Sequence, residues 1–237
     1  MVSGPAAPPA ITINLDAGEL PDEPEALLAA VDRLHVACGG HAGDAASMRR
    51  TLAIAQRHGV LVGAHPSYPD RAGFGRVSLA TTLAPAAIAD AVRAQGATLR
   101  ALAGALGVAI TSAKPHGALY HDVARTPALA AVVLDAITDA LGPVAIVTIP
   151  GALAELARAR GLRVLREGFA DRALAADGTL VPRGQPGAVL DDPARAAAQA
   201  RTLAAGGTID TLCVHGDNPH ALAIVHAVRA ALTSLSG

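Results

Sequence analysis

Short runs of β-branched residues alternate along the chain with longer stretches rich in Ala and Leu that have helical spacing. This alternation is typical of βα units, in which each strand is followed by a helix. The predicted strands are 11–15, 35–38, 60–64, 108–113, 144–149, 162–166 and 211–214. The predicted helices are 24–34, 45–58, 85–106, 127–141, 152–160, 193–205 and 219–235. About seven parallel strands over 237 residues favour an α/β fold that is a distorted, TIM-like (β/α) barrel over a small doubly wound sheet.

The chain is expected to form one such barrel domain over 11–237, preceded by a disordered segment, 1–10. We expect no second domain, linker or internal repeat. The stretch 170–186 is predicted to be a loop or hairpin that lies over one end of the barrel.

Several residues are expected to set the ends of the helices or the side that they bury. Asp44 is a suitable N-cap and Gly59 a suitable stop for the second helix, while Gly96 is expected to interrupt the third. In the last helix one apolar face is formed by Leu222, Val225, Val228, Leu232 and Leu235.

Composition excludes several classes of protein. A net charge of −1 without clustered Lys or Arg argues against a nucleic-acid partner. No segment reaches about 18 consecutive apolar residues and no signal-peptide pattern is present, so we expect a cytoplasmic protein that does not enter a membrane. Cys38 and Cys213 lack a CxxC pairing and are expected to be reduced thiols. The single lysine, Lys114, lies outside a P-loop context.

Polar side chains gather where the predicted strands end. They are Asn14, Asp16, Glu19, His41, Asp44, His65, Lys114, His116, Glu167, Asp171, Arg172, His215 and Asp217. Because the carboxyl ends of barrel strands converge on one mouth, these residues form a candidate active site. The remaining histidines are assigned no role; they are His35, His58, His121, His220 and His226.

The residue types at this mouth allow more than one chemistry. Asp16, His41 and His65 would suit a divalent transition metal with open coordination positions, or could act as acid and base catalysts without a metal. Lys114 could bind a carboxylate or phosphate, or stabilise an oxyanion as a point charge. Asp171 and the neighbouring Arg172 could form a local ion pair.

Six segments in order carry a specific resemblance. They are NLDAGE at 14–19, ACGGHAGD at 37–44, GAHPSYPDRAGFGR at 63–76, KPHGALY at 114–120, GFADRALAADGTLVPR at 168–183 and CVHGDNP at 213–219. From about residue 11 onward the chain resembles the LamB/YcsF family. The resemblance implies a barrel related to those of glycoside hydrolases and deacetylases. It also implies cleavage of 5-oxo-L-proline to L-glutamate, coupled to hydrolysis of ATP as cosubstrate and carried out with partner subunits B and C.

We expect the partner subunits to provide ATP-dependent activation and this barrel to open the activated ring. On this interpretation the catalytic residues are Asp16, His41, His65, Lys114 and His116, with His41 or His65 as the general base. The substrate-binding residues are Glu19, Asp171, Arg172, His215 and Asp217. A divalent metal on Asp16, His41 and His65 is the accompanying hypothesis.

The chain departs from the family pattern at a few positions. Thr12 and Leu15 stand where the family has Asp and Cys, and the loop after Glu19 is short. Gly40 stands where the family has Phe, and Leu174 where it has Tyr. These changes alter the first rim loop and the pocket wall. Two alternative functions remain open, a stand-alone metal-dependent amidohydrolase or carbohydrate deacetylase, and a non-catalytic regulatory subunit that binds a small acid.

Overall fold

Seven parallel strands form the centre of the molecule in a computed structural model that describes residues 11–175 and 178–235. They are β1 (Thr12–Ala17), β2 (Arg33–Ala37), β3 (Leu61–His65), β4 (Ile110–Ala113), β5 (Ala145–Thr148), β6 (Val164–Phe169) and β7 (Thr211–His215). The strands pair in chain order, and β7 pairs with β1 to close a barrel. This confirms the predicted α/β, TIM-like architecture. The segment 1–10, which was predicted to be disordered, lies outside the described residues.

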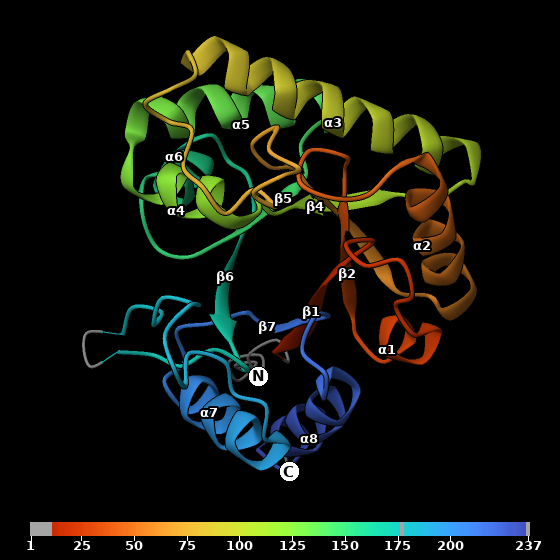
Figure 1. Cartoon of the computed structure of the whole chain (residues 1–237), viewed down its shortest axis with the longest axis vertical. Helices are drawn as coiled ribbons and strands as arrows, with labels where there is room; N and C mark the ends of the chain where they lie inside the picture. Colours follow the sequence, from red (N-terminus) through yellow and green to blue (C-terminus); the bar gives the residue numbers. More distant parts are fainter. Residues whose placement is uncertain (1–10, 176–177, 236–237) are drawn as a thin grey trace, which may run out of the picture.

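Helices surround the barrel. They are α1 (Glu25–Ala29), α2 (Ala45–His58), α3 (Pro85–Ala105), α4 (Gly117–Arg125), α5 (Pro127–Leu141), α6 (Ala152–Ala159), α7 (Pro193–Ala205) and α8 (Ala221–Thr233). In Figure 1, α3 and α5 lie side by side at one end of the view, and α7 and α8 lie together at the other. The predicted order of strands and helices is therefore confirmed, with three corrections.

Alternation along β1 separates the apolar core from a polar barrel interior. Ile13 and Leu15 are fully buried in the apolar core. Asn14 and Asp16, on the opposite side of the strand, point into the barrel, where Asn14 Nδ2 donates a hydrogen bond to Thr211 Oγ1 over 2.9 Å. The main hydrophobic core thus lies outside the sheet, and the inner side of the strands is free to carry polar residues.

The floor of the barrel interior is a hydrogen-bonded polar layer. His35 Nδ1 donates to Asn14 Oδ1 over 3.2 Å, and Ser112 Oγ lies 3.3 Å from His35 Nε2. Arg33 Nη1 also donates to Ser112 Oγ over 2.9 Å. Because β2 and β4 are not paired, the contacts of His35 and Arg33 with Ser112 cross the interior. Burial holds the pKa of His35 well below its usual value, which fits a neutral structural histidine.

The polar layer leaves no room for a side chain at Gly63 in β3. A Cβ there would lie 2.3 Å from Ser112 Oγ and 2.5 Å from His35 Cδ2. Gly63→Ala is therefore expected to destabilise the fold by about 1–3 kcal/mol, measured by urea unfolding.

Gly104 is the matched control for that substitution, because it lies in the last turn of α3 and a Cβ there would meet nothing within 4 Å. Gly104→Ala is expected to stabilise the fold by up to about 1 kcal/mol. Equal effects of the two substitutions would contradict the tight packing at Gly63.

The first correction concerns α1, which was predicted over 24–34 but ends at Ala29. Asp32 Oδ2 accepts a hydrogen bond from the backbone N–H of Ile13 over 2.7 Å, and β2 begins at the next residue, Arg33. Because Asp32 makes this hydrogen bond to β1, the helix ends before it, although the helical pattern of the sequence continues to residue 34.

The second correction is α4, which was not predicted. It begins at Gly117, two residues after Pro115, and the Lys-Pro-His-Gly sequence is typical of a loop. Gly117 has φ +57° and a Cβ there would lie 2.4 Å from the Gly75 carbonyl oxygen, so the helix starts in close contact with another loop.

The third correction is that α3 runs without interruption through Gly96. A Cβ at Gly96 would lie 2.9 Å from the Cβ of Ala140, so this glycine allows α3 and α5 to approach each other closely. The predicted caps of α2 are confirmed. The Asp44 carboxylate accepts from the backbone N–H groups of Ala46 and Ser47, and Gly59 ends the helix at φ +67°.

The remaining expectations concern 170–186 and the last helix. Antiparallel bridges join Arg172 to Val189 and Leu174 to Leu180, which confirms a hairpin-like segment. The predicted apolar face of α8 is only partly correct. Leu235 is 51% exposed, and the side that α8 buries is formed by Ala221, Ile224, Val225, Val228 and Ala231.

Candidate active site at the mouth of the barrel

Lys114 stands at the centre of the polar residues that the strand ends bring together. It follows β4, and its side chain crosses the barrel to two strands that do not pair with β4. Nζ lies 2.8 Å from Asp16 Oδ1 of β1 and 2.9 Å from Glu167 Oε1 of β6, and it donates to Asn14 Oδ1 over 3.2 Å. Although burial opposes the charge, Asp16 and Glu167 help to hold the pKa of Lys114 well above its usual value.

Hydrogen bonds and neighbouring charges also stabilise the carboxylates around Lys114. Tyr120 donates its hydroxyl hydrogen to Glu167 Oε2 over 2.6 Å. Although burial would raise it, the pKa of Asp16 lies well below its usual range, because His65 and Lys114 stabilise the carboxylate. Lys114 is 3% exposed, so its ammonium group lies deep in the mouth, paired with Asp16.

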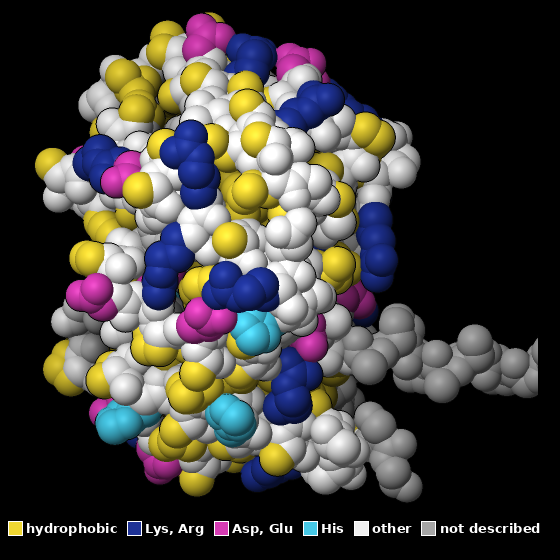
Figure 2. Space-filling view, turned by 90° about the vertical axis from the view of Figure 1, so that its right-hand side faces the viewer, with side chains coloured by type: hydrophobic (Ala, Val, Ile, Leu, Met, Phe, Trp, Pro, Cys, Tyr) yellow, Lys and Arg dark blue, Asp and Glu magenta, His cyan; other side chains and the backbone are white. Residues whose placement is uncertain are grey.

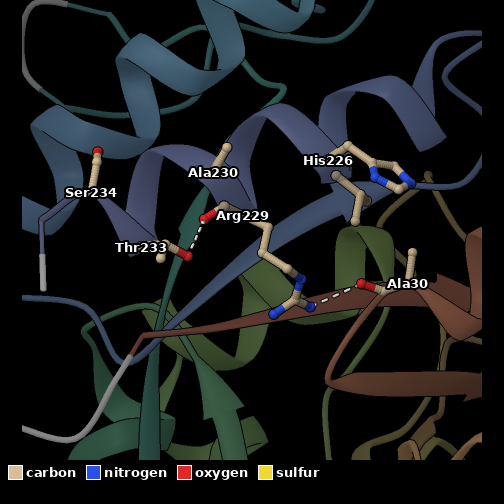
Figure 3. A pocket seen from close by; sticks show the side chains of 7 residues that line it. Ala30, His226, Arg229, Ala230, Thr233 and Ser234 are labelled. Atoms are coloured by element: carbon tan, nitrogen blue, oxygen red, sulfur yellow. Dashed lines mark hydrogen bonds between the residues drawn. The ribbon is translucent and has the colours of Figure 1, made fainter. Parts of the chain in front are cut away.

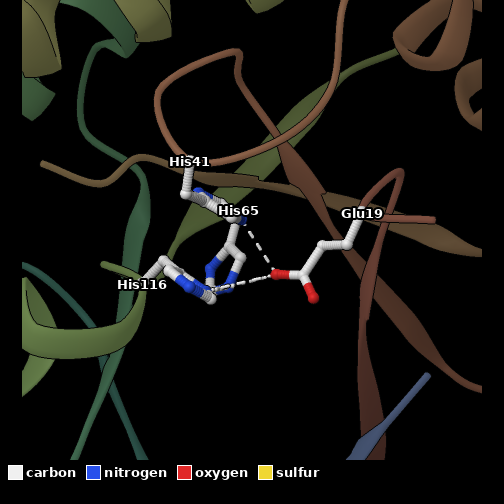
Figure 4. Close-up of side chains that lie close together, drawn as sticks. All are labelled: Glu19, His41, His65 and His116. Carbon is white, nitrogen blue, oxygen red and sulfur yellow. Dashed lines mark hydrogen bonds and ion pairs between the residues drawn. The ribbon is translucent and has the colours of Figure 1, made fainter. Parts of the chain in front are cut away.

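Three histidines and one glutamate meet beside Asp16. Figure 4 shows the imidazoles of His41, His65 and His116 gathered around the Glu19 carboxylate. Glu19 Oε1 lies 2.9 Å from His41 Nε2, 3.2 Å from His116 Nδ1 and 3.6 Å from His65 Nε2. The rings of His41 and His116 stack with centroids 3.6 Å apart. We call these four residues the histidine cluster.

Two of the histidines are oriented by backbone carbonyl groups. His65 Nδ1 donates to the Lys114 carbonyl over 2.8 Å, and His116 Nε2 donates to the Phe74 carbonyl over 3.0 Å. A carbonyl oxygen can only accept, so these nitrogens carry the ring protons. His65 Nε2 and His116 Nδ1 are then the nitrogens that face each other, 2.9 Å apart. Burial lowers the pKa of His41 to about 4, so its ring is neutral near pH 7.

The loop that supplies the Phe74 carbonyl is strained over the histidine cluster. Phe74 has φ +53°, the one positive value among the non-glycine residues that the structure describes. Its ring meets those of His41 and His116 edge to face, with centroids 5.3 and 5.5 Å apart. A Cβ at Gly75 would lie 3.0 Å from atoms of both histidines, so the loop backbone packs directly on the cluster.

Glu23 positions Glu19, a role that the sequence did not reveal. Its carboxylate accepts backbone hydrogen bonds from Gly18, Glu19 and Leu20 over 2.7, 2.9 and 3.2 Å. Glu23 is 2% exposed, and burial raises the pKa of its carboxyl group. The turn after β1 is thereby fixed, which places the Glu19 side chain in the mouth.

A second histidine site lies across the mouth. His215 Nδ1 is 2.8 Å from Asp171 Oδ1, and the backbone N–H of His215 donates to Asp171 Oδ2 over 2.9 Å. The imidazole also stacks on Phe169, with centroids 6.1 Å apart. Although burial opposes it, Asp171 raises the pKa of His215. His215 is therefore a histidine whose cationic form is stabilised.

The structure places two carboxylates beside the histidines of the predicted metal set. Asp16 Oδ2 lies 3.3 Å from His65 Nε2, but Asp16 Oδ1 is paired with Lys114. Glu19 Oε1 contacts all three imidazoles of the histidine cluster, including His41 and His116. The turn at Gly18 (φ +74°) brings Glu19 to this position after β1.

The comparisons with known proteins agree with this geometry. The model of the LamB/YcsF family matches residues 11–236. The chain belongs to the LamB/YcsF family. It is 43% identical over 221 residues to a protein of Symbiobacterium thermophilum that is named as the A subunit of 5-oxoprolinase, covering 88% of this chain and 84% of that protein. It is 40% identical over 242 residues to the protein of the same name from Bordetella pertussis, covering 94% and 95%.

Solved structures support the barrel assignment. A lactam utilization protein from Thermus thermophilus superposes with a TM-score of 0.85 at 33% identity, covering 96% of this chain and 97% of that chain. A family 4 carbohydrate esterase from Streptomyces lividans superposes with a TM-score of 0.50 at 13% identity, covering 97% and 91%. The second likeness shows the fold alone.

Gly40, a departure from the LamB/YcsF pattern, is explained by its neighbours. A Cβ there would lie 2.4 Å from Ser67 Oγ and 2.5 Å from Gln95 Oε1. Gln95 of α3 accepts from the backbone N–H of Ser67 and donates back to its carbonyl oxygen over 3.0 and 2.8 Å. The space behind His41 is therefore filled by Gln95 in this member of the family.

The outer rim of this LamB/YcsF barrel carries arginines. Asp217, which follows β7, pairs with Arg76 over 3.2 Å and with Arg183, so two cations share one carboxylate. Arg172 does not form the local ion pair that was considered with Asp171; its guanidinium donates to the carbonyl oxygens of Ala188 and Val181. Arg172 thus ties its own position to Val181 and Ala188, and Arg76 and Arg183 lie together at the rim beside Asp217.

Surfaces away from the mouth contain no comparable group of residues in the described part of the chain. Figure 3 shows a groove beside α8, where Arg229 donates to the Ala30 carbonyl oxygen over 2.8 Å, and none of the predicted site residues lines it. On the face in Figure 2, basic and acidic side chains are interspersed. Within residues 11–175 and 178–235, no helix is both long and apolar enough to cross a membrane.

Proposed function

We propose that this chain is the A subunit of an ATP-dependent 5-oxoprolinase, which cleaves 5-oxo-L-proline to L-glutamate with partner subunits B and C. The observation that carries the proposal is the match to proteins named as the A subunit of 5-oxoprolinase over nearly the whole length of both chains. The mouth supports it with acid–base residues on opposite sides. Because ATP is an intracellular cosubstrate, the proposal places the complex in the cytoplasm.

The reaction can be divided between the subunits. Transfer of phosphate from ATP to the lactam oxygen, promoted by the partner subunits, gives ADP and an O-phosphorylated cyclic imidate. Water adds to C5, and the C5–N bond breaks with its electron pair and a proton going to nitrogen, which yields γ-glutamyl phosphate. A second water displaces phosphate from this acyl phosphate and gives L-glutamate.

We assign the two sides of the mouth to the two proton transfers of ring opening. An unprotonated nitrogen of the histidine cluster, on His41 or His65, accepts the proton of water, and Asp16 orients that water. His215, paired with Asp171, donates a proton to the departing ring nitrogen. Lys114 is a positioning residue for Asp16, because its ammonium is buried and already paired.

The substrate carries a carboxylate, and the activated substrate carries a phosphate in addition. Arg76 and Arg183 at the rim both pair with Asp217, and because each guanidinium carries five N–H donors, donors remain for these anions. Glu19 lies in the histidine cluster, so we assign it to the side of the mouth where a histidine activates water.

The test is release of glutamate from 5-oxoproline by the purified chain, alone and with its B and C subunits, each with and without ATP. The proposal expects glutamate only in the complete mixture with ATP. An assembled complex that releases no glutamate under any of these conditions would refute it. ATP-independent turnover of an amide or acetyl sugar by the chain alone would instead support a metal-dependent amidohydrolase or deacetylase, a candidate favoured by the three histidines and one carboxylate in the mouth.

A pH profile tests the role of His215. Asp171 raises the pKa of His215, while Asp16 favours and Lys114 opposes the cationic form. The protonated acid is present below that pKa and is lost as the pH rises through it. Asp171→Asn is therefore expected to move the alkaline limb of kcat/KM for the complex to lower pH. A uniform loss of activity with an unshifted limb would argue against this role.

A further inference from the structure

The unexplained feature of the mouth is a set of acceptors that face one another. His65 Nε2 and His116 Nδ1 lie 2.9 Å apart, and the other nitrogen of each ring donates its proton to a backbone carbonyl. Two lone pairs at this distance repel unless a cation lies between them. Glu19 Oε1, a third acceptor, lies 3.2 Å from His116 Nδ1 and 3.6 Å from His65 Nε2. The arrangement therefore requires positive charge at its centre.

His41 completes the set. Its Nε2 lies 2.9 Å from Glu19 Oε1, and its Nδ1 is buried without a hydrogen-bond partner in the described chain. The ring stacks on His116 with an interplanar angle of 3°. Protonation of both stacked rings would give two imidazolium ions, which repel each other. Protons are therefore an unfavourable source of the positive charge at the centre of the cluster. One donor atom from each of the four residues lies within 4.8 Å of all the others.

We propose that Glu19, His41, His65 and His116 bind one divalent transition metal ion, with zinc as the best match. Three imidazoles and one carboxylate form a donor set that zinc prefers, and at bond lengths of about 2.1 Å the ligand atoms of a tetrahedral site lie about 3.4 Å apart. Four of the six separations between the ligand atoms are 2.9, 2.9, 3.2 and 3.6 Å, which bracket that value, and all six are within 4.8 Å. The ion supplies the missing positive charge at the centre of the cluster. With the ion bound, His65 has no free ring nitrogen, so the general base of the proposed function would then be His41 through its unpartnered Nδ1.

Backbone groups around the histidine cluster orient the proposed metal ligands. The carbonyl oxygens of Lys114 and Phe74 fix which nitrogen of His65 and His116 faces the centre, as outer hydrogen bonds do for metal-bound histidines. The strained backbone at Phe74 is a cost that such a site explains. Asp16 Oδ2 lies 3.3 Å from His65 Nε2, but its carboxylate is paired with Lys114 through Oδ1 and is not grouped with the three histidines as Glu19 is, so we place it beside the metal and outside the ligand set.

The experiment measures metal on the complete chain after removal of any affinity tag. Protein equilibrated with Zn²⁺ or Co²⁺ and then desalted is analysed by elemental mass spectrometry, and the cobalt form by visible absorption. We expect one ion per chain, a tetrahedral cobalt spectrum and a rise in Tm with Zn²⁺. Glu19→Gln and His116→Gln are expected to weaken Zn²⁺ binding by at least about 100-fold, since loss of an outer hydrogen bond alone costs 10–100-fold.

Two variants make the test specific. His58 Nε2 lies 2.9 Å from Glu25 Oε1 on the surface, so His58→Gln removes a His–Glu pair of the same length and should leave metal content unchanged. Asp16→Asn should also retain the ion. Metal loss in Asp16→Asn with retention in Glu19→Gln would overturn the ligand set.

The outcomes separate this inference from the proposed function. Protein that retains no ion after equilibration with either metal, although its complex releases glutamate, would overturn the metal site and leave the oxoprolinase function standing. Protein that binds one ion but releases no glutamate in the assembled complex would refute the function and leave the metal site standing. Equal Zn²⁺ affinity of wild type and His116→Gln, both folded by circular dichroism, would also overturn the site.

Discussion

Replacement of Lys114 by methionine is expected to destabilise the fold by about 3–5 kcal/mol, which is a large part of the stability of a domain of this size. Methionine fills a similar volume but leaves the carboxylates of Asp16 and Glu167 facing each other without the ammonium that separates them. Removal of one partner from a buried ion pair is costly because the remaining charge is desolvated. Urea unfolding followed by circular dichroism measures the loss.

A double variant tests the cause of that loss. Lys114→Met combined with Glu167→Gln removes one of the opposing charges, and the glutamine carbonyl can still accept from Tyr120. The double variant should therefore be more stable than Lys114→Met alone. Arg166→Met is the surface control: Arg166 and Asp210 form a two-contact ion pair that is partly exposed, and its loss should cost about 1 kcal/mol or less. A loss of equal size at the two positions would contradict the buried-charge explanation.

Asp16→Asn is expected to reduce ATP-dependent glutamate release by the complex about 10²–10⁴-fold. The Asp16 carboxylate lies between the two sides of the mouth, 3.3 Å from His65 Nε2 and grouped with Cys213 and His215 within 4.8 Å. Asparagine keeps the shape but has lost the charge that orients water and stabilises developing positive charge. The measurement is the steady-state rate of glutamate formation at saturating ATP and 5-oxoproline.

The control for Asp16→Asn is Asp90→Asn. Asp90 forms an exposed ion pair with Arg93 one helical turn away, and its neutralisation should leave the rate unchanged. An Asp16→Asn complex with full activity would show that no chemistry depends on this carboxylate, and would favour the alternative of a non-catalytic subunit that binds a small acid.

Much of the fold could be predicted because the signals are periodic. The seven strands, and the long helices α2, α3 and α5, follow from β-branched runs and Ala/Leu spacing. The caps Asp44 and Gly59 follow from local chemistry. The end of α1 and the start of α4 could not be predicted, because a long-range bond at Asp32 sets the first and a close approach of two loops at Gly117 sets the second.

The sequence predicted which residues lie at the site, but it did not predict which of their side chains contact one another. Position after a strand identifies Asp16, Glu19, His41, His65 and His116 as neighbours, since all strands of the barrel end at one mouth. Their partners depend on side-chain directions, which a one-dimensional pattern does not contain.

Two details show the limit of the pattern. The sequence paired Asp16 with the histidines, and Asp16 lies 3.3 Å from His65, but the pattern did not show that a left-handed glycine after β1 brings Glu19 to the same histidines. Glu23, which holds the same turn by three backbone hydrogen bonds, has the sequence appearance of an ordinary acidic residue before a helix.

The burial of Lys114 has a practical consequence, because this is the single lysine among 237 residues. In the folded chain, burial shields this side-chain amine from a reagent that acylates primary amines. Acylation of Lys114 requires the barrel to open. The fraction of chains labelled at Lys114, read by mass spectrometry of the peptide that contains it, therefore records how often the interior is exposed to solvent.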